Sequence, residues 1–340
     1  MSRTHLIPEY SEIVRLRDCV ETLSVSPIDG RIAAGSLAGE IAVIDSTDVH
    51  LLPYEHEFGV GAVAWSPNAA VLASGGLDGE VRIWSGDTNS ELVARGKGWV
   101  ADICWRSDGE EFAAAIGKQV VRIRVDSYGK CTEVIRHDFD STASCLSYTI
   151  NGQRLGVGSY GGVSWFETDA EPVRHFPWKG APLAISMSPN GKWVATGNQD
   201  ASIHCWKLWS GDDLQMSGYE TKIQHLDWDP TSRYLAVGSV ADISLWDFSG
   251  RGPKGSTPTQ LAGHARHVVG LRYQPNSSLI MSAGAEGTVC FWQPSSGKRS
   301  LIASVNLGYE PTCASWSQDG SCVFVGTSLG GVFKVDANGI

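Results

Sequence analysis

Short apolar runs alternate with turn-forming residues along the whole chain. The runs are rich in small and β-branched residues and the turns carry Pro, Asp, Asn or Gly, which is typical of β-strands joined by tight turns. A bulky apolar residue ends one run of each unit just before a turn, at Val25, Trp65, Trp105, Tyr148, Met187, Trp228, Tyr273 and Trp316. Successive members of this first anchor series are 39 to 45 residues apart, which predicts a repeat architecture.

A second anchor follows each first anchor after about nineteen residues, at Ile44, Trp84, Arg124, Trp165, Trp206, Trp246, Trp292 and Val335. A strand of small residues lies between the two anchors in nearly every unit, as in 32–36, 72–76 and 194–198. Each unit is therefore predicted to hold three strands joined by turns, followed by a more variable fourth strand.

The two series resemble the WD40 repeat family over essentially the whole chain. Gly263 and His264 before a first strand, and Trp246 and Asp247 after a third strand, match that family's signature literally. The resemblance implies an all-β, closed β-propeller of four-stranded blades. It also implies polar sets that hydrogen-bond within a blade, here His56, Ser74, Asp78 and Trp84 in the fullest case and His264, Ser282, Glu286 and Trp292 in the next.

Eight blades are favoured, because eight first strands are found near 20, 60, 100, 143, 182, 223, 268 and 311. The last unit ends at Ile340 without a fourth strand, whereas residues 1–18 supply a spare strand. We expect this N-terminal strand to complete the last blade and close a single domain over 1–340, which removes an open sheet edge. The alternative is seven blades, with the third unit, whose strand 120–125 lacks a Trp, as an insertion.

The polar sets resemble catalytic triads, but the WD40 context favours a structural role. Ser74 lies inside a predicted strand beside glycine, not on the strand-to-helix turn that exposes a nucleophilic serine. We therefore expect no catalytic residues.

Loops before the first strands and turns between the second and third strands form the docking face in the WD40 family. Aromatic residues and one histidine on this face are the predicted partner-binding residues, namely Phe58, Trp99, Trp178, Tyr219, His267, Tyr309 and Tyr160. Phe58 and Trp99 are the strongest candidates, since they lie nearest the loop tips. In the alternative interpretation, Phe139, Trp178 and Tyr219 take the position of His56 and pack inside the blades.

A net charge of −10 and the absence of a basic stripe argue against nucleic-acid binding. Charged residues interrupt the first twenty positions, so no signal peptide is expected, and no apolar run reaches about 18 residues. The eight cysteines form no C-x-x-C pair. We expect a cytoplasmic chain with no membrane span, metal or cofactor.

These features together favour a non-catalytic scaffold, or a subunit of a multiprotein complex, whose propeller is itself monomeric. It would bind another protein or peptide at the loop face and channel mouth. The alternative is a propeller enzyme, or a protein that binds a small ligand or a metal in the central cavity. For that alternative the first strands offer only Asp102, His225 and Asp227 as titratable groups.

Overall fold

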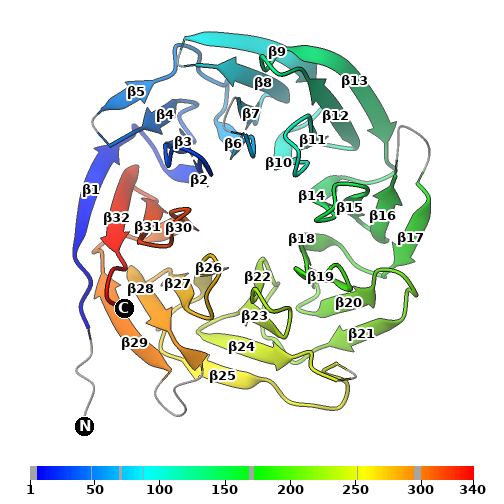
Figure 1. Cartoon of the computed structure of the whole chain (residues 1–340), viewed down its shortest axis with the longest axis vertical. Coiled ribbons are helices and arrows are strands. Elements are labelled where there is room, and N and C mark those ends of the chain that lie inside the picture. Colours follow the sequence, from blue (N-terminus) through cyan, green and yellow to red (C-terminus); the bar gives the residue numbers. More distant parts are fainter. Residues whose placement is uncertain are drawn as a thin grey trace.

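The computed structural model describes residues 6–46, 48–68, 71–86, 88–167, 172–250, 252–294 and 300–340. These residues form thirty-two strands in eight four-stranded antiparallel sheets, arranged as the blades of a ring (Figure 1). The predicted all-β, eight-bladed propeller is confirmed, and the seven-bladed alternative is wrong because the third unit forms a complete blade.

Each blade is counted from its innermost strand outward. Blade 1 contains β2 (Val20–Val25), β3 (Ile32–Ser36), β4 (Ile41–Ile44) and β5 (Val49–Leu51), and blade 2 contains β6 (Val60–Trp65), β7 (Leu72–Gly76), β8 (Glu80–Ser85) and β9 (Asn89–Arg95). Blade 3 contains β10 (Val100–Trp105), β11 (Glu111–Ile116), β12 (Gln119–Val125) and β13 (Cys131–Asp138), and blade 4 contains β14 (Ala143–Tyr148), β15 (Leu155–Ser159), β16 (Gly162–Phe166) and β17 (Arg174–Pro177). Blade 5 contains β18 (Pro182–Met187), β19 (Trp193–Asn198), β20 (Ile203–Lys207) and β21 (Asp213–Met216). Blade 6 contains β22 (His225–Trp228), β23 (Tyr234–Gly238), β24 (Asp242–Asp247) and β25 (Thr259–Ala262). Blade 7 contains β26 (Val268–Tyr273), β27 (Ile280–Gly284), β28 (Thr288–Trp292) and β29 (Leu301–Asn306). Blade 8 contains β30 (Pro311–Trp316), β31 (Cys322–Thr327), β32 (Gly331–Asp336) and β1 (Tyr10–Arg15).

The N-terminal strand closes the ring, as predicted. β1 pairs antiparallel with β32, so that Tyr10 lies opposite Val335 and Arg15 lies opposite Gly331. Upstream of β1, Leu6 forms a parallel bridge to Ala303 of β29, in blade 7. The start of the chain is therefore tied to the last two blades and covers the edge that β32 would otherwise expose.

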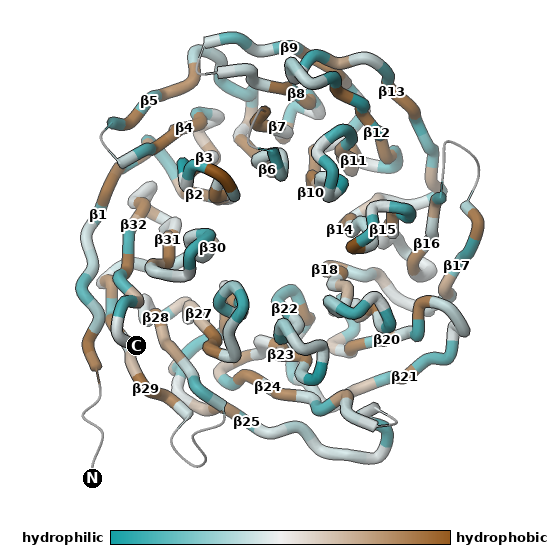
Figure 2. Tube along the Cα trace, viewed as in Figure 1, coloured by the Kyte–Doolittle hydropathy of each residue, from teal (hydrophilic) through white to brown (hydrophobic). Residues whose placement is uncertain are grey.

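The hydrophobic core lies between neighbouring blades and not at one centre, which explains why hydrophobic residues are spread over all eight blades in Figure 2. At the junction of blades 1 and 2, for example, buried Trp84 and Leu72 pack with Ile41 and Val43. The second strands of most blades are fully buried, because a blade covers each of their faces; this is why small and apolar residues fill them.

First-anchor tryptophans also join the blades by hydrogen bonds. The indole N–H of Trp105 donates to the carbonyl of Ala64 at 2.9 Å, and that of Trp316 donates to the carbonyl of Arg272 at 3.2 Å. In both cases the acceptor lies on the inner strand of the preceding blade. The first anchor series therefore marks contacts between repeats as well as the end of each inner strand.

The second anchor series is displaced by one residue in blades 3 and 4. In blade 2 the anchor Trp84 pairs with Leu72, and the residues at the corresponding positions are Ile123 and Phe166, not Arg124 and Trp165 as predicted. The turn between the second and third strands is one residue shorter in these two blades than in blade 2, which reverses the face of each following residue.

Trp165 consequently faces blade 5, where it packs with Phe176 and Trp206. Gly156 makes room for this orientation, since a Cβ atom there would lie 2.8 Å from the Trp165 ring. Across the part of the chain that the structure describes, there is no helix with the length and hydropathy to cross a membrane.

Candidate functional site

The polar set of blade 2 is a continuous chain of hydrogen bonds from Trp84 to Asp78. Ser74 Oγ accepts the indole N–H of Trp84 at 2.9 Å and lies 2.9 Å from His56 Nε2, while His56 Nδ1 lies 3.3 Å from the Asp78 carboxylate. Burial lowers the pKa of His56, so its imidazole is neutral at pH 7. A proton on Nδ1 satisfies Asp78 and leaves Nε2 to accept the hydroxyl proton of Ser74, so every polar atom has a partner.

Blade 7 repeats this arrangement with Glu in place of Asp. His264 Nδ1 lies 2.6 Å from the carboxylate of Glu286, and Ser282 Oγ lies 2.7 Å from His264 Nε2 and accepts the indole N–H of Trp292 at 2.8 Å. Both serine hydroxyls and both histidines are buried. The predicted sets are therefore brought together as interlocked strand contacts, in which neither serine is open to a substrate.

The carboxylate of each set also holds the loop that leads into the inner strand. Asp78 accepts the backbone N–H of Glu57 at 2.8 Å, and Glu286 accepts that of Arg266 at 3.1 Å. The polar sets therefore position the tips of these two loops, which carry Phe58 in blade 2 and His267 in blade 7.

Aromatic residues take the position of His56 in three other blades. The backbone N–H of His56 donates to the carbonyl of Gly39, and those of Phe139 and Trp178 donate in the same way to Lys118 and Gly161. In blade 6 the indole N–H of Trp246 donates to the hydroxyl of Tyr219 at 2.8 Å, where blade 2 uses Ser74. Trp178 lies against His204, with ring centroids 4.2 Å apart. Phe139, Trp178 and Tyr219 thus lie at the position of His56, which is where the alternative interpretation of the sequence places them.

Other predicted contact residues are open to solvent on what we call the top face, the face that carries the loops into the inner strands and the turns between second and third strands. Phe58 is 73% exposed, Trp99 53% and Tyr160 65%, and His267 is also exposed. Tyr309 differs, because it is half-buried. Its ring lies between the ring of Phe333, with centroids 5.5 Å apart, and the guanidinium of Arg15.

Four exposed apolar side chains lie on top-face loops and turns of the successive blades 8, 1, 2 and 3, and we call this set the apolar arc: Leu329, Leu37, Phe58 and Trp99. Backbone contacts place Leu37 beside the loop that carries Phe58. The N–H of Leu37 donates to Cys19, and a Cβ atom on Gly59, next to Phe58, would lie 3.1 Å from the Leu37 Cα. The carbonyl of Leu329 accepts a guanidinium N–H of Arg15, at the end of the outer strand β1 of the same blade. The sequence did not single out Leu37 as a contact residue.

The backbone of Phe58 is left-handed, with a φ of 67°. Side chains with a Cβ atom rarely adopt this conformation, and an aromatic residue there is an outlier. The loop is held on both sides, by the bond from the Glu57 N–H to Asp78 and by the bond from the Leu77 N–H to the Gly59 carbonyl. The fold therefore holds a large apolar ring in solvent on a strained backbone.

The titratable groups of the inner strands are used as links between blades. The carboxylate of Asp102 accepts the backbone N–H of Leu146 in blade 4, and that of Asp227 accepts the N–H of Tyr273 in blade 7, both at 2.8 Å. Burial raises the pKa of Asp102 to about 6 and also raises that of Asp227, whereas burial and the positive charge of Arg272 lower the pKa of His225 to about 4. Within the described ranges, no three His, Cys, Asp or Glu side chains come together as metal ligands would.

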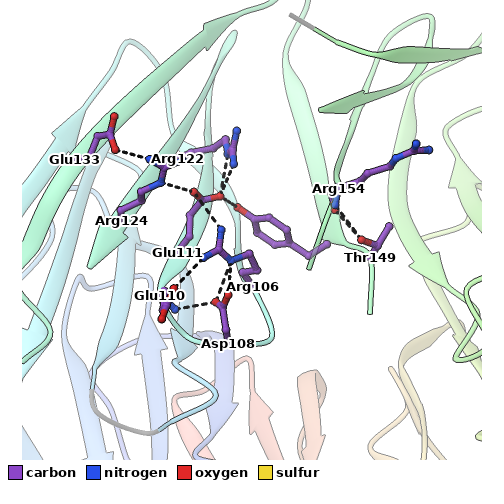
Figure 3. Close-up of polar contacts among 10 residues, drawn as sticks. Arg106, Asp108, Glu110, Glu111, Arg122, Arg124, Glu133, Thr149 and Arg154 are labelled. Atoms are coloured by element: carbon purple, nitrogen blue, oxygen red, sulfur yellow. Dashed lines mark hydrogen bonds and ion pairs between the residues drawn. The ribbon is translucent and has the colours of Figure 1, made fainter. Parts of the chain in front are cut away.

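A buried ionic cluster joins blades 3 and 4 (Figure 3). Glu111, which is fully buried, accepts hydrogen bonds from Arg122 at 2.7 and 2.9 Å, from Arg124 at 3.2 Å and from the hydroxyl of Tyr148 at 2.8 Å. Arg106 lies 3.7 Å from the same carboxylate. This cluster was not predicted from the sequence, although a glutamate at the start of the otherwise apolar strand β11 was a visible signal.

The profile of the family described as "WD domain, G-beta repeat" matches residues 48–85, 171–207 and 255–293, which include the third strands of blades 2, 5 and 7. The solved structure described as "Structure of Dos1 propeller" superposes with a TM-score of 0.85 at 15% identity, covering 97% of this chain and 94% of that one. The chain is a WD40-repeat β-propeller.

Relatives of this WD40 propeller have low sequence identity to it. Protein LST8 homolog of Drosophila melanogaster is 25% identical over 66% of this chain and 75% of its own length. DDB1- and CUL4-associated factor 13 of Xenopus tropicalis is 22% identical over 80% of this chain and 63% of its own. The structure of Chaetomium thermophilum Sqt1 bound to the N-terminus of the ribosomal protein L10 has a TM-score of 0.81 at 16% identity, covering 97% of this chain and all of that one.

Proposed function

We propose that this WD40 propeller is a non-catalytic interaction platform that binds a protein or peptide partner on its top face, with Phe58 and Trp99 as the main anchors. Tyr160, Tyr309 and His267 would lie at the margin of the contact. The propeller itself would act as a monomeric subunit within a larger complex.

The observation that carries this proposal is the exposed ring of Phe58 on a strained backbone. Exposed apolar residues are common, but Phe58 lies in the apolar arc and its backbone conformation is disfavoured. Aromatic anchors are typical of protein interfaces. Sqt1, which shares the fold, is a precedent for peptide binding, because its solved complex contains the N-terminus of the ribosomal protein L10.

A non-catalytic role is supported by the way the polar groups are used. The two triad-like sets have buried serines whose hydroxyls are engaged on both sides, and Asp102 and Asp227 bind backbone N–H groups of the next blade. We also propose a cytoplasmic, reducing location, which the eight unpaired cysteines support.

The test is affinity purification from cells of the source organism, with three versions of the tagged protein compared by quantitative mass spectrometry. The first is wild type, the second carries Phe58→Ala and Trp99→Ala, and the third carries Tyr128→Ala and Ile150→Ala. Tyr128 and Ile150 are exposed apolar residues in turns on the opposite face and serve as the matched control. A partner that is lost only from the top-face variant supports the proposal; a partner retained by that variant and lost from the control overturns it.

A further inference from the structure

A recess lies at the junction of blades 5 and 6 on the bottom face, which is opposite the top face. It has a volume of about 730 Å³ and is built from three separate turns. Lys192 comes from the turn between β18 and β19, Trp209 from the turn between β20 and β21, and Lys254 from the loop between β24 and β25. We call it the lysine groove, lined chiefly by Lys192, Trp193, Lys207, Trp209, Leu214 and Lys254.

The floor of the lysine groove is apolar and firmly packed. Trp193 is buried and its ring makes an edge contact with Phe248, with centroids 5.2 Å apart. Lys207 Nζ lies 5.6 Å from the centroid of the Trp193 ring, which places a positive charge over an aromatic face. Gly252 lies against this floor, since a Cβ atom there would be 3.5 Å from Trp193 and from Leu214.

Trp209 forms an exposed wall of the groove, and two arginines fix its position. Its ring is 57% exposed, and the guanidinium of Arg154 from blade 4 lies 4.7 Å from the ring centroid. Arg174 donates to the backbone carbonyls of Leu208 at 3.2 Å and Trp209 at 2.6 Å. The indole therefore has a defined position before any ligand arrives, which reduces the entropy lost on binding.

Three lysines and two aspartates line the groove, on a chain whose net charge is −10. Asp212 pairs with Lys207 at 3.3 Å, and the carboxylate of Asp213 lies 2.8 Å from Nε2 of His204, whose pKa is lowered by burial. Among the ion pairs of the described residues, none involves Lys192 or Lys254, and both of these lysines are exposed. Two ammonium groups are thus available beside an apolar floor.

We propose that the lysine groove binds an acidic peptide segment in which carboxylate side chains flank one apolar side chain. The apolar side chain would lie against Trp193 and Trp209, and the carboxylates would reach Lys192 and Lys254. Most of the lining residues are solvent-exposed, so the groove is open along one side. That shape suits an extended chain better than a small molecule, which a binding pocket normally encloses on most sides. The inference is independent of the top-face proposal and would let the propeller hold two partners on opposite faces.

The experiment measures fluorescence anisotropy of the fluorescein-labelled peptide EEELEEE and of its neutral counterpart QQQLQQQ with the purified full chain. We expect the acidic peptide to bind about tenfold tighter than the neutral one, and the difference to shrink as salt is raised, because exposed charges are screened. Lys192→Glu combined with Lys254→Glu should weaken binding of the acidic peptide by about tenfold or more. Trp209→Ala should weaken both peptides, since it removes the apolar wall.

The matched control is Lys97→Glu combined with Lys222→Glu, which makes the same charge change at exposed lysines in top-face loops. This control should leave peptide binding and the unfolding temperature unchanged. Equal affinity for the two peptides, or an equal loss in the groove and control variants, would overturn the proposal. So would inorganic phosphate binding that saturates at the groove while the acidic peptide fails to compete.

Discussion

The indole N–H of Trp84 donates to Ser74 Oγ at 2.9 Å, and the same oxygen serves His56 on its other side. One hydroxyl therefore joins the second and third strands of blade 2 to the loop that carries Phe58. Stability of the blade and presentation of the top-face loop are linked through this atom.

Ser74→Ala should destabilise the protein by about 1–3 kcal/mol, because it leaves the buried polar atoms of His56 and Trp84 without a partner. The free energy of unfolding in urea measures this cost. Ser127→Ala, at an exposed turn, is the control and should change it by less than about 0.5 kcal/mol. Equal stability of the two variants would show that the hydrogen-bond chain contributes nothing.

Deletion of residues 1–18 should lower the unfolding temperature by about 5 °C or more, because it uncovers the edge of β32 and removes the buried Leu16. Deletion of residues 1–5 alone, upstream of the Leu6 bridge, is the comparison and should have a much smaller effect. Differential scanning calorimetry measures both. A chain without β1 that melts at the wild-type temperature would contradict closure by the N-terminal strand.

Glu111→Gln keeps the shape of the side chain but leaves buried Arg122 beside a neutral group. We expect a loss of about 3–5 kcal/mol in the free energy of unfolding, the usual result of breaking a buried ion pair on one side. Glu110→Gln, at the exposed neighbour, should be nearly neutral. If both substitutions cost the same, the cluster does not hold blades 3 and 4 together.

Asp102 has a raised pKa of about 6, against an ordinary value of 3.8, because burial disfavours its charged form. Between these two pH values the folded protein holds a proton that the unfolded chain releases, so stability falls as pH rises through this window. Asp102→Asn should therefore be more stable than wild type at pH 7.5 by about 1–3 kcal/mol, with an advantage that shrinks as pH falls from about 6 towards 4. Urea unfolding across that range measures it; a variant that is less stable by the same amount at every pH would contradict this assignment.

The blade count was predictable from the two phased anchor series, and the polar set of His56, Ser74 and Trp84 from the resemblance to the WD40 family. The positions of Ile123 and Phe166 were not, since they depend on turns that are one residue shorter, and glycines such as Gly117 and Gly161 fit turns of either length. A spacing of nineteen residues therefore selected Arg124, and residue type selected Trp165.

The functional surfaces depend on geometry that no spacing reveals. Phe58 was predicted as a contact residue from its place in a loop, but its left-handed backbone is visible only in three dimensions. Tyr219 has the composition of an interface residue, yet its hydroxyl accepts a hydrogen bond from Trp246 inside the blade. The lysine groove combines turns near Lys192 and Lys254 that are distant in sequence.

Partner binding at the top face can be tested by site-specific photocrosslinking in cells of the source organism. A benzophenone amino acid replaces Phe58, Trp99 or Tyr128 in turn, and crosslinked products are identified by mass spectrometry. We expect that one partner crosslinks at both Phe58 and Trp99 and not at Tyr128 on the opposite face. A partner that crosslinks at Tyr128 and at neither top-face position would contradict the proposed role of the top face.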